Sequence, residues 1–287
     1  MNDGATGEGL VAGIDEATGA ALIEIVRAAA AREILPRFRN LADDEIDTKA
    51  GPDDLVTIAD RAAEAAITIA ARDLLPDALV IGEEAVSETP DLLALMEDAK
   101  TCVVIDPVDG TSNFASGIAA FGVILSVVER GQPVFGLLYD PVLDDWIVAH
   151  KGQGAWFSAP GRAPRRLTTR PRPPAGRLQG FVPVDLFEPM DRAPVMARFA
   201  PLGPTRALRC SCHEYRTIAF GHADYAVSPE PKPWDHAAGA LIVAEAGGHA
   251  TVAGTAPYLP ARSDGPLIIA SSRDVALDVA RMASNKG

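Results

Sequence analysis

Residues 103–114 read VVIDPVDGTSNF, an apolar run that leads directly into two acids, a proline and a glycine. The apolar residues predict a buried strand, which places Asp106 and Asp109 where that strand ends. The proline fixes the exit of the chain and Gly110 permits a tight turn. The two carboxylates and the carbonyl of Val108 can then converge on a hard cation that prefers oxygen ligands, with Thr111 beside it. An isolated Asp-Pro-x-Asp-Gly is more often an ordinary turn, so this interpretation depends on acids elsewhere in the chain.

Two further acidic segments occupy comparable places. Glu83 and Glu84 follow a short apolar run at 78–81, which predicts a second strand with acids at its end. Asp235 stands in the first turn of an apolar helix expected over 234–246. Taken singly, the glutamates are explained as a solvated surface pair, and Asp235 by a helix-dipole interaction of about 0.3 to 1 kcal/mol. Neither explanation accounts for the recurrence of acids at the ends of elements.

The segment DLVTIAD at 54–60 adds a fourth acidic site. Thr57, followed at the third position by Asp60, is a variant of the capping box, so we expect a helix over 57–75 in which both residues serve as caps. Asp54 is left facing the loop before that helix.

The remaining pattern predicts an α/β protein. Amphipathic spacing indicates helices over 18–38 and 273–283, and short apolar runs indicate strands at 102–105, 121–129, 133–139 and 146–149, with a hairpin turn at Gly131-Gln132. Proline and glycine become frequent between 160 and 180, which suggests a seam near residue 155. We expect an N-terminal α+β subdomain (1–155) with most candidate ligands and a C-terminal α/β subdomain (156–287) that contributes Asp235. The two would form one catalytic unit.

Composition limits the classes of function. The chain has 287 residues and a formal net charge of −13, which disfavours a general electrostatic attraction to nucleic acid or to an anionic bilayer. The one basic cluster, at 162–177, is interleaved with proline and is expected to be a solvated loop or an edge strand. In a chain this acidic, divalent cations would neutralise the clustered carboxylates described above. The charge balance therefore favours a metal site.

The three cysteines, Cys102, Cys210 and Cys212, do not make a disulfide framework or a structural zinc site, and reduced thiols suit a cytoplasmic protein. The first thirty residues lack the pattern of a signal peptide, and no apolar run approaches the roughly 20 residues that span a bilayer. We therefore expect no membrane role.

The four acidic segments, in this order and at this spacing, resemble the inositol monophosphatase family within the lithium-sensitive, metal-dependent sugar phosphatases. The resemblance covers nearly the whole chain and includes Gly247-Gly248 after the apolar helix. It implies a layered α/β/α/β/α sandwich of the inositol monophosphatase and fructose-1,6-bisphosphatase type, usually a homodimer. It also implies Mg²⁺-dependent hydrolysis of a small phosphate monoester.

The resemblance also implies roles for individual residues. Glu83, Asp106 and the Val108 carbonyl would bind one Mg²⁺, and Asp106, Asp109 and Asp235 a second. Glu83 and Thr111 would orient the attacking water, with Asp54 holding a weaker third ion or its water network. The N–H groups of Gly110 and Thr111 would hold phosphate oxygens. Water would attack directly without a phosphoenzyme, so Cys102 is expected in the core, and His213, His222 and His236 in structural or surface roles.

The chain departs from the family pattern on the substrate side. Ser228 stands where close relatives have an acid that binds substrate hydroxyls, and Glu230 replaces that acid only if the loop is shifted. A small-residue loop of the relatives is replaced by the bulkier and more basic 209–213, which contains Arg209 and Ser211. The residues expected to bind substrate are Gly110, Thr111, Arg209, Ser211, Ser228 and Asp235. Arg209 could pair with a second phosphate or a carboxylate of the substrate. Histidinol phosphate, fructose 1,6-bisphosphate and phosphoadenosine phosphate therefore remain alternatives to inositol phosphate, and a non-catalytic regulatory or binding protein on the same fold is the alternative class.

Overall fold

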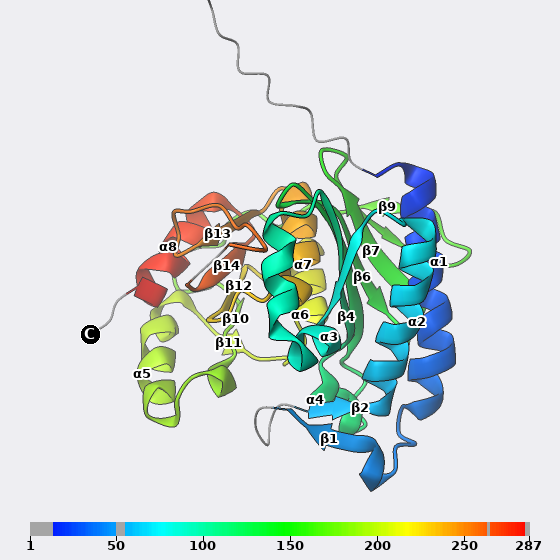
Figure 1. Cartoon of the computed structure of the whole chain (residues 1–287). Coiled ribbons are helices and arrows are strands. Elements are labelled where there is room, and N and C mark those ends of the chain that lie inside the picture. The colour runs from blue at the N-terminus through cyan, green and yellow to red at the C-terminus, as the bar shows by residue number, and fades with distance from the viewer. Residues whose placement is uncertain (1–13, 50–54, 263–264, 285–287) are drawn as a thin grey trace, which may run out of the picture.

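A computed structural model describes residues 14–49, 55–262 and 265–284 of the chain. Its elements form two sheets with helices outside and between them (Figure 1). A small additional ribbon pairs β1 (Ile46–Thr48) with β2 (Leu55–Thr57).

The larger sheet has seven strands in the order β3-β4-β5-β6-β7-β8-β9. Only the β3–β4 pair is parallel, and the other pairs are antiparallel neighbours in sequence. The strands are β3 (Leu79–Gly82), β4 (Thr101–Asp109), β5 (Gly122–Glu129), β6 (Gln132–Asp140), β7 (Asp145–His150), β8 (Ala155–Ser158) and β9 (Arg165–Arg166). The central strands are apolar almost throughout because both faces of the sheet are covered.

One face of this sheet packs on α1 (Glu16–Ala29) and α2 (Ile58–Leu74). Alternate residues of the strands point toward these helices, so Val103 and Ile105 of β4 share a buried cluster with Leu22, Val26 and other apolar residues of the two helices. The expected capping box begins α2: Thr57 accepts from the backbone N–H of Ala59, and Asp60 accepts from that of Thr57. The helix predicted over 57–75 is confirmed.

The opposite face packs on α6 (Ser211–Ala219) and α7 (Pro233–Glu245), which come from the second half of the chain. Val104, Ile124 and Leu138 point to this side. The contact is close at Gly136 of β6, where a Cβ would lie 2.8 Å from the carbonyl oxygen of Ala238 in α7. Glycine at this strand position is therefore what allows the helix backbone to approach the sheet.

A five-stranded sheet follows, in the order β11-β10-β12-β14-β13. Its outer face is covered by α5 (Pro189–Phe199) and α8 (Arg273–Ser284). The strands are β10 (Gly180–Phe181), β11 (Thr205–Arg206), β12 (Tyr225–Ser228), β13 (His249–Val252) and β14 (Leu267–Ala270). Helix, sheet, helix, sheet and helix layers succeed one another across Figure 1, which confirms the predicted α/β/α/β/α sandwich.

Several local predictions changed in detail. The helix expected over 18–38 is α1 followed by a π-helical turn (Ala30–Ile34) and a 3₁₀ turn (Leu35–Arg37). The hairpin between β5 and β6 turns at Arg130-Gly131, both at positive φ, one residue before the predicted position. The basic cluster at 162–177 was expected to be a solvated loop or an edge strand. It contains β9, the exposed edge strand of the larger sheet. The subdomain division at residue 155 stays a prediction.

The short helix α3 (Glu83–Glu88) begins directly after β3, and the short helix α4 (Thr111–Ala115) begins two residues after the end of β4. Both helices therefore start beside the acids at the ends of those strands. In the part of the chain that the structure describes, no helix is long and apolar enough to cross a membrane.

Candidate active site

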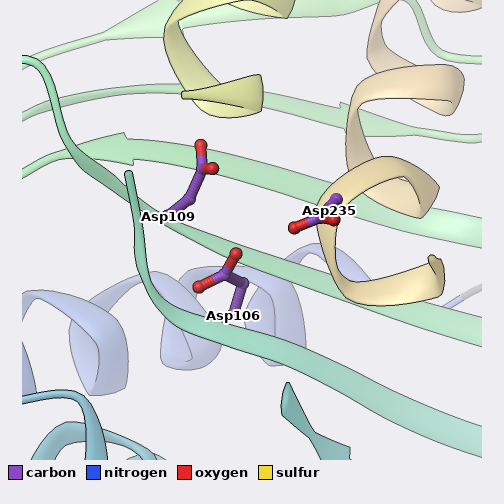
Figure 2. A group of neighbouring side chains, drawn as sticks. All are labelled: Asp106, Asp109 and Asp235. Atoms are coloured by element: carbon purple, nitrogen blue, oxygen red, sulfur yellow. The ribbon is translucent and has the colours of Figure 1, made fainter. Parts of the chain in front are cut away.

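Three carboxylates from two distant parts of the chain meet at the end of β4. Asp106 and Asp109 project from this strand and Asp235 from the first turn of α7, toward a common space (Figure 2). One carboxylate oxygen of each lies within 4.8 Å of the others. The structure therefore brings together the three acids predicted to bind the second ion.

A bulge in β4 is what allows Asp106 and Asp109 to face the same way. Residues three apart on a regular strand point to opposite faces. The pairing with β5 shifts between these two acids: Asp106 lies opposite Ile124 and Asp109 opposite Gly122, so β4 carries one extra residue here. The bulge contains Pro107, which has no N–H to give to the ladder.

The three acids are closely placed, and two of them, Asp106 and Asp109, are buried. Asp106 is 1% exposed and Asp109 is 7% exposed. Burial first, and then the neighbouring carboxylates, raise the pKa of Asp106 well above its ordinary value and that of Asp109 to about 7. Acids this close can all be ionised near neutral pH when a bound cation compensates their charges. An all-oxygen donor set of this kind fits a hard divalent ion such as Mg²⁺.

The N-terminus of α6 holds Asp109. Its carboxylate accepts hydrogen bonds from the backbone N–H groups of Ser211, at 3.1 Å, and Cys212, and from the thiol of Cys210, at 3.1 Å. These donors fix the orientation of the side chain and favour its ionised form. The segment 209–213 therefore positions a candidate metal ligand in addition to lining the cleft.

Glu83 begins α3, and its carboxylate is paired with a residue that the sequence pattern did not single out. The Lys49 ammonium donates to Glu83, at 2.9 Å, and to Glu84, at 2.7 Å. The Lys49 side chain is 10% exposed, so it is a nearly buried counter-charge for the two acids. It approaches from the end of the β1 ribbon.

Asp60 is the second residue that the sequence analysis missed at the site, because its capping role explained it fully. One carboxylate oxygen binds Thr57, and the other accepts from the Thr111 hydroxyl at 3.0 Å. The same hydroxyl lies 2.9 Å from the carbonyl oxygen of Val108. Burial raises the pKa of Asp60 to about 6. Asp60 differs from most helix caps, which are solvated, because it is 1% exposed. Its burial is visible in the structure and not in the capping pattern of the sequence.

A cleft of about 190 Å³ opens above these groups. Its lining includes Gly110, Thr111, Arg209, Ser211, Ser228 and Asp235, all of which were predicted to bind substrate. Gly110 has a φ of +86°, and a Cβ there would lie 2.9 Å from the carbonyl oxygen of Ala120. The turn between β4 and α4 therefore requires glycine at this position.

The cleft wall around Ser228 is an internal hydrogen-bonded chain. The Ser228 hydroxyl contacts the Glu230 carbonyl oxygen at 2.8 Å and His236 Nε2 at 3.0 Å. Because Nε2 also faces that carbonyl at 2.9 Å, it carries the ring proton, and Nδ1 accepts from the Tyr215 hydroxyl at 2.7 Å. Burial lowers the pKa of His236 to about 4, consistent with this neutral ring. The Glu230 side chain is exposed and pairs with Lys232 at 3.4 Å.

The remaining predicted positions are placed as follows. Cys102 lies in the core at 1% exposed, His213 Nε2 faces the carbonyl oxygen of Phe121 at 3.0 Å, and His222 is exposed. Asp54 falls outside the described residues.

Comparison with known proteins agrees with this geometry. The profile of the inositol monophosphatase family matches residues 15–282. The chain belongs to the inositol monophosphatase family. Among relatives, a fructose-1,6-bisphosphatase/inositol-1-monophosphatase from Thermotoga maritima is 31% identical over 72% of this chain and 75% of its own length. A protein named Nus factor SuhB from Vibrio cholerae is 30% identical over 79% of this chain and 82% of its own.

The solved structures give the same result for the fold. An inositol monophosphatase structure from Thermotoga maritima matches with a TM-score of 0.74 and 25% identity, over 91% of this chain and 95% of that chain. The family is one of metal-dependent phosphatases, and the acidic cluster at Asp106, Asp109 and Asp235 could hold a metal ion.

Proposed function

We propose that this chain is a Mg²⁺-dependent phosphatase that hydrolyses a small soluble phosphate monoester by direct attack of water. The observation that carries the proposal is the cluster of the carboxylates of Asp106, Asp109 and Asp235, two of which, Asp109 and Asp235, line a cleft sized for a small ligand. Without a cation, three ionised acids this close would repel one another and any phosphate.

The ligands in this proposal are Asp106, Asp109 and Asp235, with Glu83 and the Val108 carbonyl completing a site for two ions. Divalent cations held there would neutralise the acids and polarise the phosphoryl group as Lewis acids. The N-terminal N–H groups of α6 fix Asp109, and the bulge in β4 fixes its direction relative to Asp106. A third ion near Asp54 remains part of the proposal.

Thr111 and Asp60 are the groups of this chain placed to handle a proton. The Thr111 hydroxyl has one hydrogen, and both Asp60 and the Val108 carbonyl lie in reach of it. When it donates to Asp60, its lone pairs can accept a hydrogen bond from a water in the cleft. We infer that Thr111 orients the attacking water. A proton of this water passes through the Thr111 hydroxyl to Asp60, and Glu83 is a second group in contact with the same water.

The position of the thiols supports attack by water instead of by a protein nucleophile. Cys102, Cys210 and Cys212 are each at most 2% exposed. In addition, the Cys210 sulfur is engaged with the carboxylate of Asp109.

The test is phosphate release from a panel of monoesters with and without Mg²⁺, for the wild type, Asp235→Asn and Asp274→Asn. Asp235→Asn removes one charge from the cluster with little change in shape and should lower turnover by at least about 1,000-fold, the scale of losing a group that acts on the transition state. Asp274→Asn, an exposed acid of α8, should match the wild type. Millimolar Li⁺ should inhibit.

Thermal unfolding gives an independent readout of the metal site. Mg²⁺ should stabilise the wild type because it binds only the folded chain, and Asp235→Asn should lose most of that shift. Mg²⁺-independent turnover, or full turnover in Asp235→Asn, would refute the proposed mechanism.

A second candidate function rests on one observation: a relative at 30% identity is named Nus factor SuhB. Under this alternative the chain is a binding protein that keeps the fold. It would show the Mg²⁺ stabilisation but release no phosphate from any ester, and it would copurify with a stoichiometric macromolecular partner. The homodimer expected from the resemblance stays a prediction, which sedimentation velocity would check.

A further inference from the structure

Arg209 stands out among the groups of the cleft. Of the described residues that line the cleft, it is the one lysine or arginine. Its φ is +53°, in the left-handed region that residues with a Cβ adopt with strain and glycine adopts freely. The chain therefore places a long cationic side chain at a backbone position that favours glycine, and strain of this kind is retained where the side chain has a use.

The guanidinium spans the cleft between two elements. Its Nε lies 3.0 Å from the Asp185 carboxylate, and Nη2 donates to the Ser112 hydroxyl at 3.2 Å. Ser112 directly follows Thr111, so this contact places the cation close to the residues proposed to hold the phosphate and the water. The Arg209 and Asp185 side chains are 38% and 33% exposed. An ion pair this hydrated contributes little to stability, so a ligand anion can replace Asp185 at small cost.

Once metals are bound, the acids of the cleft other than Asp185 supply no counter-charge to this cation. The three acids of the cluster would be neutralised by divalent ions. Glu214, buried in the same cleft, has its pKa raised to about 8 by burial, so it is mostly neutral at neutral pH. The charge that faces a ligand at this end of the cleft is then that of the guanidinium, shared with Asp185.

We propose that Arg209 binds a second anionic group of the substrate, a phosphate or a carboxylate, so that the preferred esters carry such a group in addition to the phosphate that is hydrolysed. The inference rests on the proposed function and names the substrate class of that site. The planar guanidinium can donate two parallel hydrogen bonds to either anion, which a monoester bearing only hydroxyls does not offer.

The test uses two matched ester pairs: inositol monophosphate with inositol bisphosphate, and glycerol phosphate with phosphoglycerate. Affinity is measured by titration calorimetry on Ca²⁺-loaded protein, and turnover separately with Mg²⁺. The variants are Arg209→Gly, Arg209→Lys and Arg206→Ala. Glycine suits the positive φ, so loss of folding is not expected. Arg206 is an exposed residue of β11 that lies outside the cleft lining, so Arg206→Ala removes a nearby positive charge without changing the cleft.

The wild type should bind the doubly anionic member of at least one pair about 10- to 100-fold more tightly, the range that charge-assisted hydrogen bonds supply. Arg209→Gly should abolish this preference, Arg209→Lys should retain part of it, and Arg206→Ala all of it. The pair that shows the effect identifies the anion. A preference that survives in Arg209→Gly, or that is missing from the wild type for both pairs, overturns the proposal.

The two proposals fail separately. A preference in binding that depends on Arg209, without phosphate release from any ester, leaves the anion site intact and refutes hydrolysis. Phosphate release without any preference for the doubly anionic esters refutes the anion site and leaves the proposed hydrolysis intact.

Discussion

At the residue scale, Glu214 shows what the interior of this cleft does to an acid. Its carboxylate is 7% exposed and accepts one hydrogen bond, from the backbone N–H of Leu208 at 2.9 Å. Burial is the main cause that raises its pKa from 4.5 to about 8, and the charges of Asp109 and Asp185 raise it further. The folded protein therefore holds a proton on Glu214 at pH values where the unfolded chain has lost it.

The stability of the metal-free protein should depend on pH through this group. Below about pH 4.5 both states are protonated and Glu214 contributes no penalty. Between pH 4.5 and 8 the unfolded state releases the proton and the folded state keeps it, so stability falls as pH rises. Glu214→Gln keeps an acceptor for Leu208 and removes the titration. It should be more stable than wild type at pH 9, on the order of a few kcal/mol, and nearly equal to it at pH 5.

Urea unfolding at pH 5, 7 and 9 with a chelator present measures this difference. Glu97→Gln, at a glutamate whose side chain is 46% exposed, is the matched control and should track the wild type at every pH. A Glu214→Gln advantage that does not grow with pH contradicts the assignment.

At the scale of the elements, α6 connects the metal site to the larger sheet. Its first turn donates to Asp109, and one turn later Arg216 donates to the carbonyl oxygen of Leu138 in β6 at 2.9 Å and pairs with Asp145 of β7. Arg216 is 5% exposed. The helix is thereby fixed at both ends against the strands that it covers.

Removing the guanidinium from this contact should be costly. Arg216→Met leaves the Asp145 carboxylate, 13% exposed, without its partner, and we expect a loss of about 3 to 5 kcal/mol in the free energy of unfolding. The double variant Arg216→Met/Asp145→Asn should recover part of it, because the unpaired charge is gone. Arg281→Met removes an exposed i,i+3 pair with Asp278 and should cost less than about 1 kcal/mol. Denaturant unfolding of the four proteins checks the order. Equal losses in both single variants would mean that burial of the Arg216 pair is unimportant.

At the scale of the whole molecule, segments from both halves of the chain pack together into one core and one cleft. The larger sheet is built from residues 79–166, and α6 and α7, which follow it in the chain, cover one of its faces. The acidic cluster follows the same pattern, with Asp106 and Asp109 from one half and Asp235 from the other.

A fragment that ends at residue 178 should therefore not fold to a native state. It contains all seven strands of the larger sheet but lacks α6 and α7, so Val104, Ile124 and Leu138 would face water. We expect the fragment alone to aggregate and to give a weak near-ultraviolet circular dichroism signal. Coexpression with residues 179–287 should restore both its solubility and a native near-ultraviolet signal. A soluble fragment with a cooperative unfolding transition would contradict this expectation and favour two independent domains.

The layered fold and the acidic cluster were largely predictable because their signals are local. The apolar run before Asp106, the capping box at Thr57 and Asp60, and the apolar helix after Asp235 each depend on residues a few positions apart. Element ends were less predictable: the strand expected to end at residue 105 continues to Asp109, since its pairing with β5 resumes after the bulge.

Local patterns in the sequence identify the oxygen ligands at the ends of elements, together with the family to which the chain belongs. The packing of the layers determines which groups meet these ligands: Asp60 at Thr111, Lys49 between Glu83 and Glu84, and Arg209 at Asp185. These contacts join residues far apart in the chain, and they exist because of sheet register, the bulge in β4 and the approach of α6 and α7 to the sheet. Local propensity does not encode such distances. The burial that raises the pKa values of these acids is likewise a property of the packed layers.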